Sequence, residues 1–174
     1  LIMRYIQGEA LAQEIIRDTL TFGRKIEIFL QVCNAIRFAH SRGVLHRDIK
    51  PQNVLVGPFG ETFVIDWGIS KLASSAPPPE NFSPGSLQTL SGGMAGTPTY
   101  MPPEILRSPI SYVNERTDVY GLGVLLVNLL GTVHPFAAGS LEELIDAKLE
   151  ERYQPLPPDA PKEFAAIARK AMHP

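Results

Sequence analysis

A long amphipathic segment, a polar octapeptide and two short strand-like runs follow one another directly, and this order constrains the fold of the 174-residue chain most. Residues 21–40 carry apolar side chains three and four positions apart, which predicts one helix, and Gly43 stands where a left-handed cap is usual. The apolar positions of this expected helix are Ile26, Phe29, Leu30, Cys33 and Ile36. Residues 54–56 and 62–65 are β-branched or aromatic, and the Gly57-Pro58-Phe59-Gly60 between them favours a hairpin. The pattern therefore predicts helices packed around a small β element.

The second half of the chain is helical in its pattern. Residues 116–130 are apolar nearly all round, as expected of a buried helix. Ser140 and Glu143 form a capping-box pattern that opens another helix, and residues 161–172 predict a last one. Its expected inward side chains are Phe164, Ile167, Ala168 and Ala171. Residues 70–96 are rich in Ser, Pro and Gly and predict a long loop, so the expected fold class is mainly α.

Charge and cysteine content exclude several partners and settings. The chain has 16 Lys and Arg against 18 Asp and Glu, with no basic cluster, so we expect no nucleic-acid partner. The longest apolar stretch, residues 121–133, is broken by Asn128 and is shorter than the roughly 20 residues that span a bilayer, so we expect no membrane segment within this chain. Cys33 is the only cysteine, which fits a reducing compartment and predicts a cytoplasmic location.

The octapeptide His46-Arg47-Asp48-Ile49-Lys50-Pro51-Gln52-Asn53 is the strongest chemical signal, and we expect it on the loop between the long helix and the hairpin. Its carboxylate, the cation two residues on and the amide five residues on can converge on one point. That point suits a phosphate group with its metal ion. The alternative is that His, Asp and Asn decorate a turn, which the length of the pattern disfavours.

Three further motifs follow in order. Asp66-Trp67-Gly68 comes directly after an apolar strand, which can present a carboxylate in a cleft, although such a tripeptide alone is usually a turn. Gly96-Thr97-Pro98-Thr99-Tyr100-Met101-Pro102-Pro103-Glu104 and Asp118-Val119-Tyr120-Gly121-Leu122-Gly123 complete the set. Together the four motifs resemble those of the C-terminal lobe of protein kinases: H-R-D-x-x-x-x-N, D-F-G, G-T-x-x-Y-x-A-P-E and D-V-Y-S-L-G. The sequence pattern as a whole resembles that of bacterial eukaryotic-like Ser/Thr kinases. Lys50-Pro51 in the octapeptide resembles the Ser/Thr type of catalytic loop.

The resemblance implies a role for each matched residue, with ATP and Mg²⁺ as cofactors and Ser/Thr-bearing proteins as substrates. Asp48 is the expected catalytic base, Lys50 the contact to the transferred phosphate, and Thr97 the support of both. Asn53 and Asp66 are the expected magnesium ligands. The implied structural residues are His46, Trp67, Gly68, Glu104 and Asp118.

The start of the chain resembles the last strand of a kinase N-lobe entering the hinge. The implied ATP-binding residues are Met3 as gatekeeper, the backbone of Arg4 and Ile6, Gln52, and Leu55 and Ile65 as the adenine floor. Plain core packing is the alternative for the apolar members of this set. Ala10 stands where an acidic ribose contact is common, and whether Glu9 replaces it is open.

The resemblance implies a partial kinase domain over residues 1–174. Residues 1–8 would be the last N-lobe strand and hinge, and residues 9–174 the C-lobe, with the catalytic loop at 46–53 and the activation segment at 66–104. The chain contains no G-x-G-x-x-G loop and no V-A-I-K-like lysine, which we expect before Leu1. We therefore expect the chain to be a fragment that is inactive alone.

The serine-rich loop offers a regulatory hypothesis. A phosphate on Ser86, Thr89 or Ser91 would dock on Arg47 and order the loop, and simple disorder is the alternative.

Two other functions are alternatives to an active kinase. A pseudokinase acting as a binding or scaffold module is permitted by Trp67, Pro102 and Ala10, which depart from the pattern. A small-molecule phosphotransferase of the aminoglycoside or choline type is disfavoured by Arg47 and Glu104.

Overall fold

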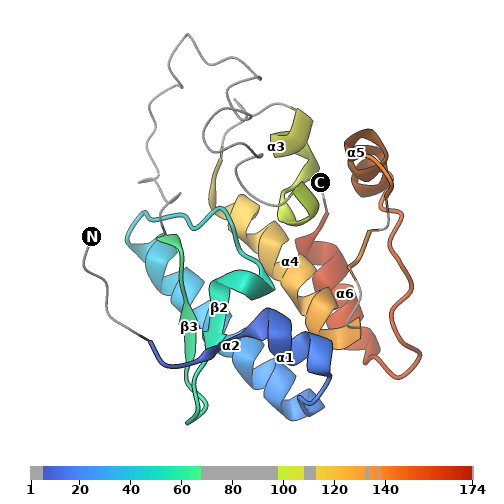
Figure 1. Cartoon of the computed structure of the whole chain (residues 1–174). Coiled ribbons are helices and arrows are strands. Elements are labelled where there is room, and N and C mark those ends of the chain that lie inside the picture. Colours follow the sequence, from blue (N-terminus) through green and yellow to red (C-terminus); the bar gives the residue numbers. More distant parts are fainter. Residues whose placement is uncertain (1–5, 68–97, 108–112, 132–133, 137, 174) are drawn as a thin grey trace.

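The computed structural model describes residues 6–67, 98–107, 113–131, 134–136 and 138–173 (Figure 1). These residues are mostly helical, as the sequence predicts, and they include a small three-stranded antiparallel sheet. The elements in chain order are β1 (Glu9–Ala10), α1 (Leu11–Arg17), α2 (Phe22–Ser41), the 3-10 turn η1 (Pro51–Asn53), β2 (Val54–Val56), β3 (Thr62–Val64), the 3-10 turn η4 (Pro98–Tyr100), α3 (Pro103–Arg107), α4 (Glu115–Gly131), α5 (Leu141–Leu149) and α6 (Lys162–Ala171). Among the described residues, no helix has the length and apolar character needed to cross a membrane.

Local capping groups set the ends of the predicted helices. Thr21 Oγ1 accepts a hydrogen bond from the Arg24 N–H at 3.3 Å and opens α2, and Gly43 adopts a φ of 71° just after the helix. Ser140 Oγ accepts from the Glu143 N–H at 3.1 Å and opens α5. The Glu143 carboxylate reaches back to the N–H of Gly139 rather than to that of Ser140, which shifts the reciprocal bond of the capping box by one residue.

Two side chains expected in the core face solvent instead. Leu30 is 56 % exposed, because the buried stripe of α2 is formed by Ile28, Val32, Ile36 and Ala39. Ile167 is 53 % exposed. Its helix, α6, packs on α4 at Gly123, where an added Cβ would lie 2.9 Å from Ala171 Cβ. This close approach directs Ala168 and Ala171 toward α4 and leaves Ile167 outside.

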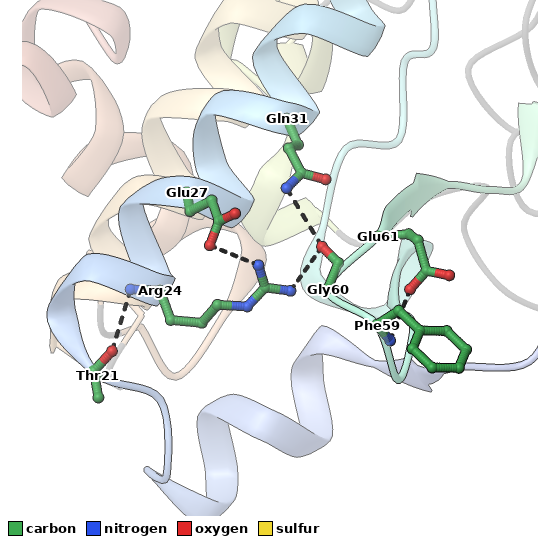
Figure 2. Close-up of polar contacts among 7 residues, drawn as sticks. All are labelled: Thr21, Arg24, Glu27, Gln31, Phe59, Gly60 and Glu61. Carbon is green, nitrogen blue, oxygen red and sulfur yellow. Dashed lines mark hydrogen bonds and ion pairs between the residues drawn. The ribbon is translucent and has the colours of Figure 1, made fainter.

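The predicted hairpin forms, and β1 adds a third strand that the sequence analysis did not anticipate. The strand order is β1-β2-β3, with Ala10 opposite Leu55 and Leu55 opposite Phe63. The turn is tied to α2, because Arg24 Nη2 and Gln31 Nε2 both donate to the Gly60 carbonyl, at 2.9 and 3.4 Å (Figure 2). The hairpin is thus held against the helix that precedes the octapeptide.

The core consists of two apolar clusters that share α4. One joins α1, α2 and β2 to Leu125 and Leu129 of α4, and the other joins α5 and α6 to Val124 and Leu126. Both clusters therefore anchor α4 between Tyr120 and Leu129. Figure 1 shows α4 running through the middle of the molecule between α2 and α6.

Candidate active site

The octapeptide crosses the N-terminal turn of α4, and Asp118 of that turn holds its backbone. The buried Asp118 accepts from the N–H of His46 through Oδ2 at 2.9 Å and from the N–H of Arg47 through Oδ1 at 2.7 Å. Oδ2 also lies 2.7 Å from Nε2 of His40. Arg47 has a φ of 70°, a left-handed conformation that is unusual for a residue with a Cβ. The two bonds to one carboxylate hold this conformation.

His46 links the octapeptide to the segment that carries Asp66. Its Nδ1 accepts from the Asp48 N–H at 3.3 Å, so the proton lies on Nε2, which donates to the Ile65 carbonyl at 3.0 Å. The imidazole also meets the Trp67 ring edge to face, with centroids 4.6 Å apart. The buried histidine therefore joins two of the sequence motifs.

Asp48, Lys50 and Asn53 converge as the octapeptide pattern predicts. The Lys50 ammonium lies 2.6 Å from Asp48 Oδ2, and Asn53 Nδ2 donates to the same oxygen at 2.9 Å and to the Asp48 carbonyl at 2.8 Å. Both side-chain bonds fall on Oδ2. The other carboxylate oxygen, Oδ1, is therefore the atom suited to accept from an incoming hydroxyl group.

Asp66 lies next to this cluster. The N–H of Ile65 donates to the Asn53 carbonyl at 2.9 Å, which fixes the residue before Asp66 to the end of the octapeptide. Asp66 is exposed and has a φ of 65°, a second left-handed position in a non-glycine residue. Trp67 Nε1 donates to the Val64 carbonyl at 2.9 Å, a bond that the Phe of the usual motif cannot make.

The oxygen donors of Asn53 and Asp66 fit a magnesium ion. Because Asn53 Nδ2 donates to Asp48, its Oδ1 is the atom left to coordinate a cation. Carboxylate and amide oxygens are hard ligands, and Mg²⁺ usually takes one or two of them together with water and substrate phosphates. No cluster of three His, Cys, Asp or Glu side chains occurs among the described residues.

One face of the small sheet is apolar and does not point into the core. Val54, Val56 and Val64 face the core cluster, so their neighbours face the other side of the pleat. Leu55 and Ile65 lie on this second face and are half-buried. Ala10 joins them as the register partner of Leu55.

The remaining residues at this edge are placed as follows. Ile6 is half-buried and Gln52 is exposed. The Glu9 carboxylate is occupied by Arg17, whose Nη1 and Nη2 each lie 2.6 Å from one of its oxygens.

A family comparison decides what kind of domain this is. A model described as the protein kinase domain matches residues 1–172. The chain belongs to the protein kinase family. Members of this family generally use ATP and Mg²⁺.

Curated relatives of this kinase chain are serine/threonine-protein kinases named PknD. The chain is 34 % identical over 174 residues to that of Protochlamydia amoebophila, which covers 87 % of this chain and 17 % of the relative. It is 38 % identical over 140 residues to that of Chlamydia caviae, covering 75 % and 14 %. For Chlamydia trachomatis serovar D the identity is 33 % over 185 residues, covering 95 % and 19 %. The kinase chain thus spans less than a fifth of the length of these relatives.

Several predicted site residues lie outside the described residues. They are Met3, Arg4, Gly68, Ser86, Thr89, Ser91 and Thr97.

Of the remaining motif residues, Glu104 is exposed in the first turn of α3. The Arg47 side chain is half-buried, and its Nε has no hydrogen-bond partner in the described part of the kinase chain. Burial lowers the pKa of Arg47, and Asp118 acts in the opposite direction.

Sequence reasoning missed Lys148, a fully buried lysine of α5 that contacts η4. Burial lowers its pKa to about 7, and the Glu104 carboxylate acts in the opposite direction. The sequence signal that could have indicated its burial was its spacing from the apolar residues of the same helix. Lys148 follows Leu144 by four positions and therefore shares the inward face of the helix.

Proposed function

We propose that this chain is the C-terminal lobe of an active Ser/Thr protein kinase, which transfers the γ-phosphate of ATP to Ser or Thr hydroxyls of proteins. The observation that best supports this proposal is the arrangement at Asp48. Lys50 and Asn53 both bind its Oδ2 and leave Oδ1 for the acceptor hydroxyl. In this proposal residues 1–8 are the end of the N-lobe and the hinge, and residues 9–174 the C-lobe. The pairing of β1 with β2 supports a boundary before Glu9.

The chemistry follows from the atoms at the site. The acceptor hydroxyl donates its hydrogen bond to Asp48 Oδ1, and its oxygen attacks the γ-phosphorus. The bond from that phosphorus to the oxygen bridging the β- and γ-phosphates breaks, so that ADP leaves and the hydroxyl proton passes to Asp48. Lys50, which lies against Asp48, stabilises negative charge on the transferred group. Thr97 supports both residues in this proposal.

Asn53 Oδ1 and the Asp66 carboxylate are the proposed metal ligands. A magnesium ion there would neutralise charge on the β- and γ-phosphates. The apolar sheet face with Leu55 and Ile65 is the proposed floor under adenine, with Met3, the backbone of Arg4 and Ile6, and Gln52 as the other ATP contacts. Glu9 is engaged by Arg17 and is not assigned to the ribose.

Arg47 is the proposed docking residue for a regulatory phosphate. Its buried Nε has no partner among the described residues, and a phosphate would supply oxygen acceptors and two negative charges. The residues proposed to carry that phosphate are Ser86, Thr89 and Ser91. The cytoplasmic location remains a prediction from the single cysteine.

Phosphoryl transfer in the complete encoded protein tests the proposal. The protein is incubated with Mg²⁺ and ATP labelled at the γ-phosphorus, with dephosphorylated casein as the acceptor. Labelled phosphoserine or phosphothreonine is expected from the wild type, and none above background from Asp48→Asn. Asp159→Asn is the matched control, because Asp159 is an exposed carboxylate outside the site. A wild type that binds Mg·ATP without transferring phosphate would establish the pseudokinase alternative instead.

A further inference from the structure

Lys148 of α5 carries an ammonium group that is completely enclosed by protein. Its relative exposure is 0 %, and it is the largest fully buried side chain among the described residues. The elements around it are η4, α4 and the segment at Phe136. Burying a lysine is costly unless its charge is compensated, so a packing role alone does not account for this residue.

Part of this cost is offset by one short stretch of backbone. Lys148 Nζ donates to the carbonyl oxygens of Pro98 at 3.2 Å and Thr99 at 2.9 Å, and also to that of Met101. A lysine ammonium has three N–H donors, so one group satisfies three carbonyls that point to the same spot. The ammonium also lies 4.9 Å from the centre of the Tyr120 ring and 5.3 Å from that of Phe136. An apolar side chain of equal volume could fill the space but could not hold this turn.

The other side of the same turn borders a surface groove. The groove has a volume of about 270 Å³. Its lining residues are Pro98, Thr99, Phe136, Ala138, Gly139, Ser140, Leu141 and Leu144. Three of them, Pro98, Thr99 and Phe136, also contact the Lys148 ammonium. Lys148 therefore fixes one wall of the groove from behind.

The groove is continuous with the proposed catalytic set along the chain. Pro98 directly follows Thr97, the residue proposed to support Asp48 and Lys50. A polypeptide whose Ser or Thr lies at Asp48 needs an adjacent surface to receive its neighbouring residues. An open groove with both backbone and apolar lining suits an extended peptide.

We propose that Lys148 is a positioning residue for the protein substrate, which holds the 98–101 backbone so that the groove accepts the peptide beside the acceptor hydroxyl. This inference rests on the proposed kinase function. In this inference Lys148 affects binding of the protein substrate, whereas other residues bind ATP. Loss of the ammonium should therefore raise the KM for the protein substrate and spare the KM for ATP.

The test uses the complete encoded protein and dephosphorylated casein at pH 6.5, below the lowered pKa of Lys148, so that the ammonium is present. Lys148→Met keeps the volume and removes the donors, and we expect the KM for casein to rise about tenfold, while kcat and the KM for ATP stay within about twofold. Lys148→Arg keeps a cation at the same place and should recover at least half of the lost casein affinity. Lys170→Met, an exposed lysine of α6, is the matched control and should behave as the wild type.

The outcomes separate this inference from the function on which it rests. An inactive wild type would contradict the kinase proposal itself. An active wild type together with an unchanged casein KM in Lys148→Met would overturn the role of Lys148 alone. The role is equally overturned if the KM for ATP rises as much as that for casein, or if Lys148→Arg is as impaired as Lys148→Met. Should Lys148→Met fail to fold, Lys148→Gln, which is neutral and shorter, is measured under the same criteria.

Discussion

Arg47 and Asp118, 71 residues apart in the chain, are joined by a 2.7 Å hydrogen bond from the Arg47 N–H to Asp118 Oδ1. The same carboxylate accepts from the N–H of His46 at 2.9 Å. The two bonds connect the octapeptide to α4, the helix that both core clusters share. The site is thus attached directly to the core.

Replacing Asp118 by Asn should destabilise the protein and loosen the octapeptide. The Asn side chain has one oxygen acceptor where Asp has two, and its NH2 group would face a backbone N–H that needs an acceptor. The buried negative charge that strengthens both hydrogen bonds is also lost. We therefore expect a loss of about 3 kcal/mol in the free energy of unfolding. Urea unfolding measures the loss, and hydrogen exchange of the amides at 46–48 should accelerate. Asp159→Asn is the exposed control and should change stability by less than about 0.5 kcal/mol. Equal behaviour of the two variants would show that Asp118 does not hold the octapeptide.

Replacing Trp67 by Phe restores the usual motif and removes the Nε1 bond to the Val64 carbonyl. We expect a loss of about 1 kcal/mol in stability, because one partly buried hydrogen bond is lost and the ring contact with His46 remains possible. Phosphoryl transfer should stay within about threefold of the wild type. An inactive wild type that gains activity in Trp67→Phe would instead mark Trp67 as the cause of lost catalysis.

Lys148 should make stability depend on pH in a defined direction. Its pKa is lowered to about 7 in the folded protein, whereas an unfolded lysine titrates near about 10.4. Between these values the unfolded chain binds more protons, so the free energy of unfolding rises with pH. Relative to Lys148→Met, the wild type should gain roughly 1 kcal/mol per pH unit from pH 7.5 to 9. Urea unfolding of both proteins at each pH measures this difference.

The comparison with Lys148→Met also controls for the groups around the lysine. Glu104 of α3, Tyr120 of α4 and His134 face or influence this position and are present in both proteins. The charge of Lys148 lowers the pKa of His134 further below its usual value, away from the range between pH 7.5 and 9. A wild-type advantage that stays constant from pH 7.5 to 9 would contradict a lowered pKa at Lys148.

The serine-rich segment, residues 70–96, should be phosphorylated in the active protein. We expect phosphate on Ser86, Thr89 or Ser91 after incubation with Mg·ATP, detected by phosphopeptide mapping. Activation by this phosphate should depend on Arg47, because charge-assisted hydrogen bonds of roughly 1.5–3 kcal/mol each would join them. Arg47→Ala should therefore abolish the difference between the phosphorylated and dephosphorylated protein. An unmodified loop in an active enzyme, or a difference that survives in Arg47→Ala, would contradict this switch.

The parts of the fold that were predictable are those encoded locally. The hairpin and the ends of α2 depend on turn and cap residues such as Gly43 and Thr21, which act over a few positions. The strand β1 was not predictable, since two residues become a strand only by pairing with β2. The exposure of Leu30 and Ile167 likewise depends on which neighbour each helix meets.

The candidate site likewise contains residues that could be predicted from local sequence and one residue that could not. Asp48, Lys50 and Asn53 belong to one contiguous octapeptide, so their convergence could be expected from spacing alone. Lys148 was missed because its partners lie 47 to 50 positions away, and a lysine in an amphipathic helix usually marks the solvent side. Only tertiary packing reveals a buried ammonium.

In the proposed mechanism, Asp48 positions the acceptor hydroxyl while Asp66 holds the metal that accompanies ATP. The most direct test is steady-state kinetics and Mg·ATP binding of Asp48→Asn and Asp66→Asn in the complete encoded protein. Phosphoryl transfer should be lost in both variants, but only Asp66→Asn should also weaken Mg·ATP binding, by about tenfold or more. Near wild-type turnover in either variant, or equal loss of Mg·ATP binding in both, would contradict this account of the site.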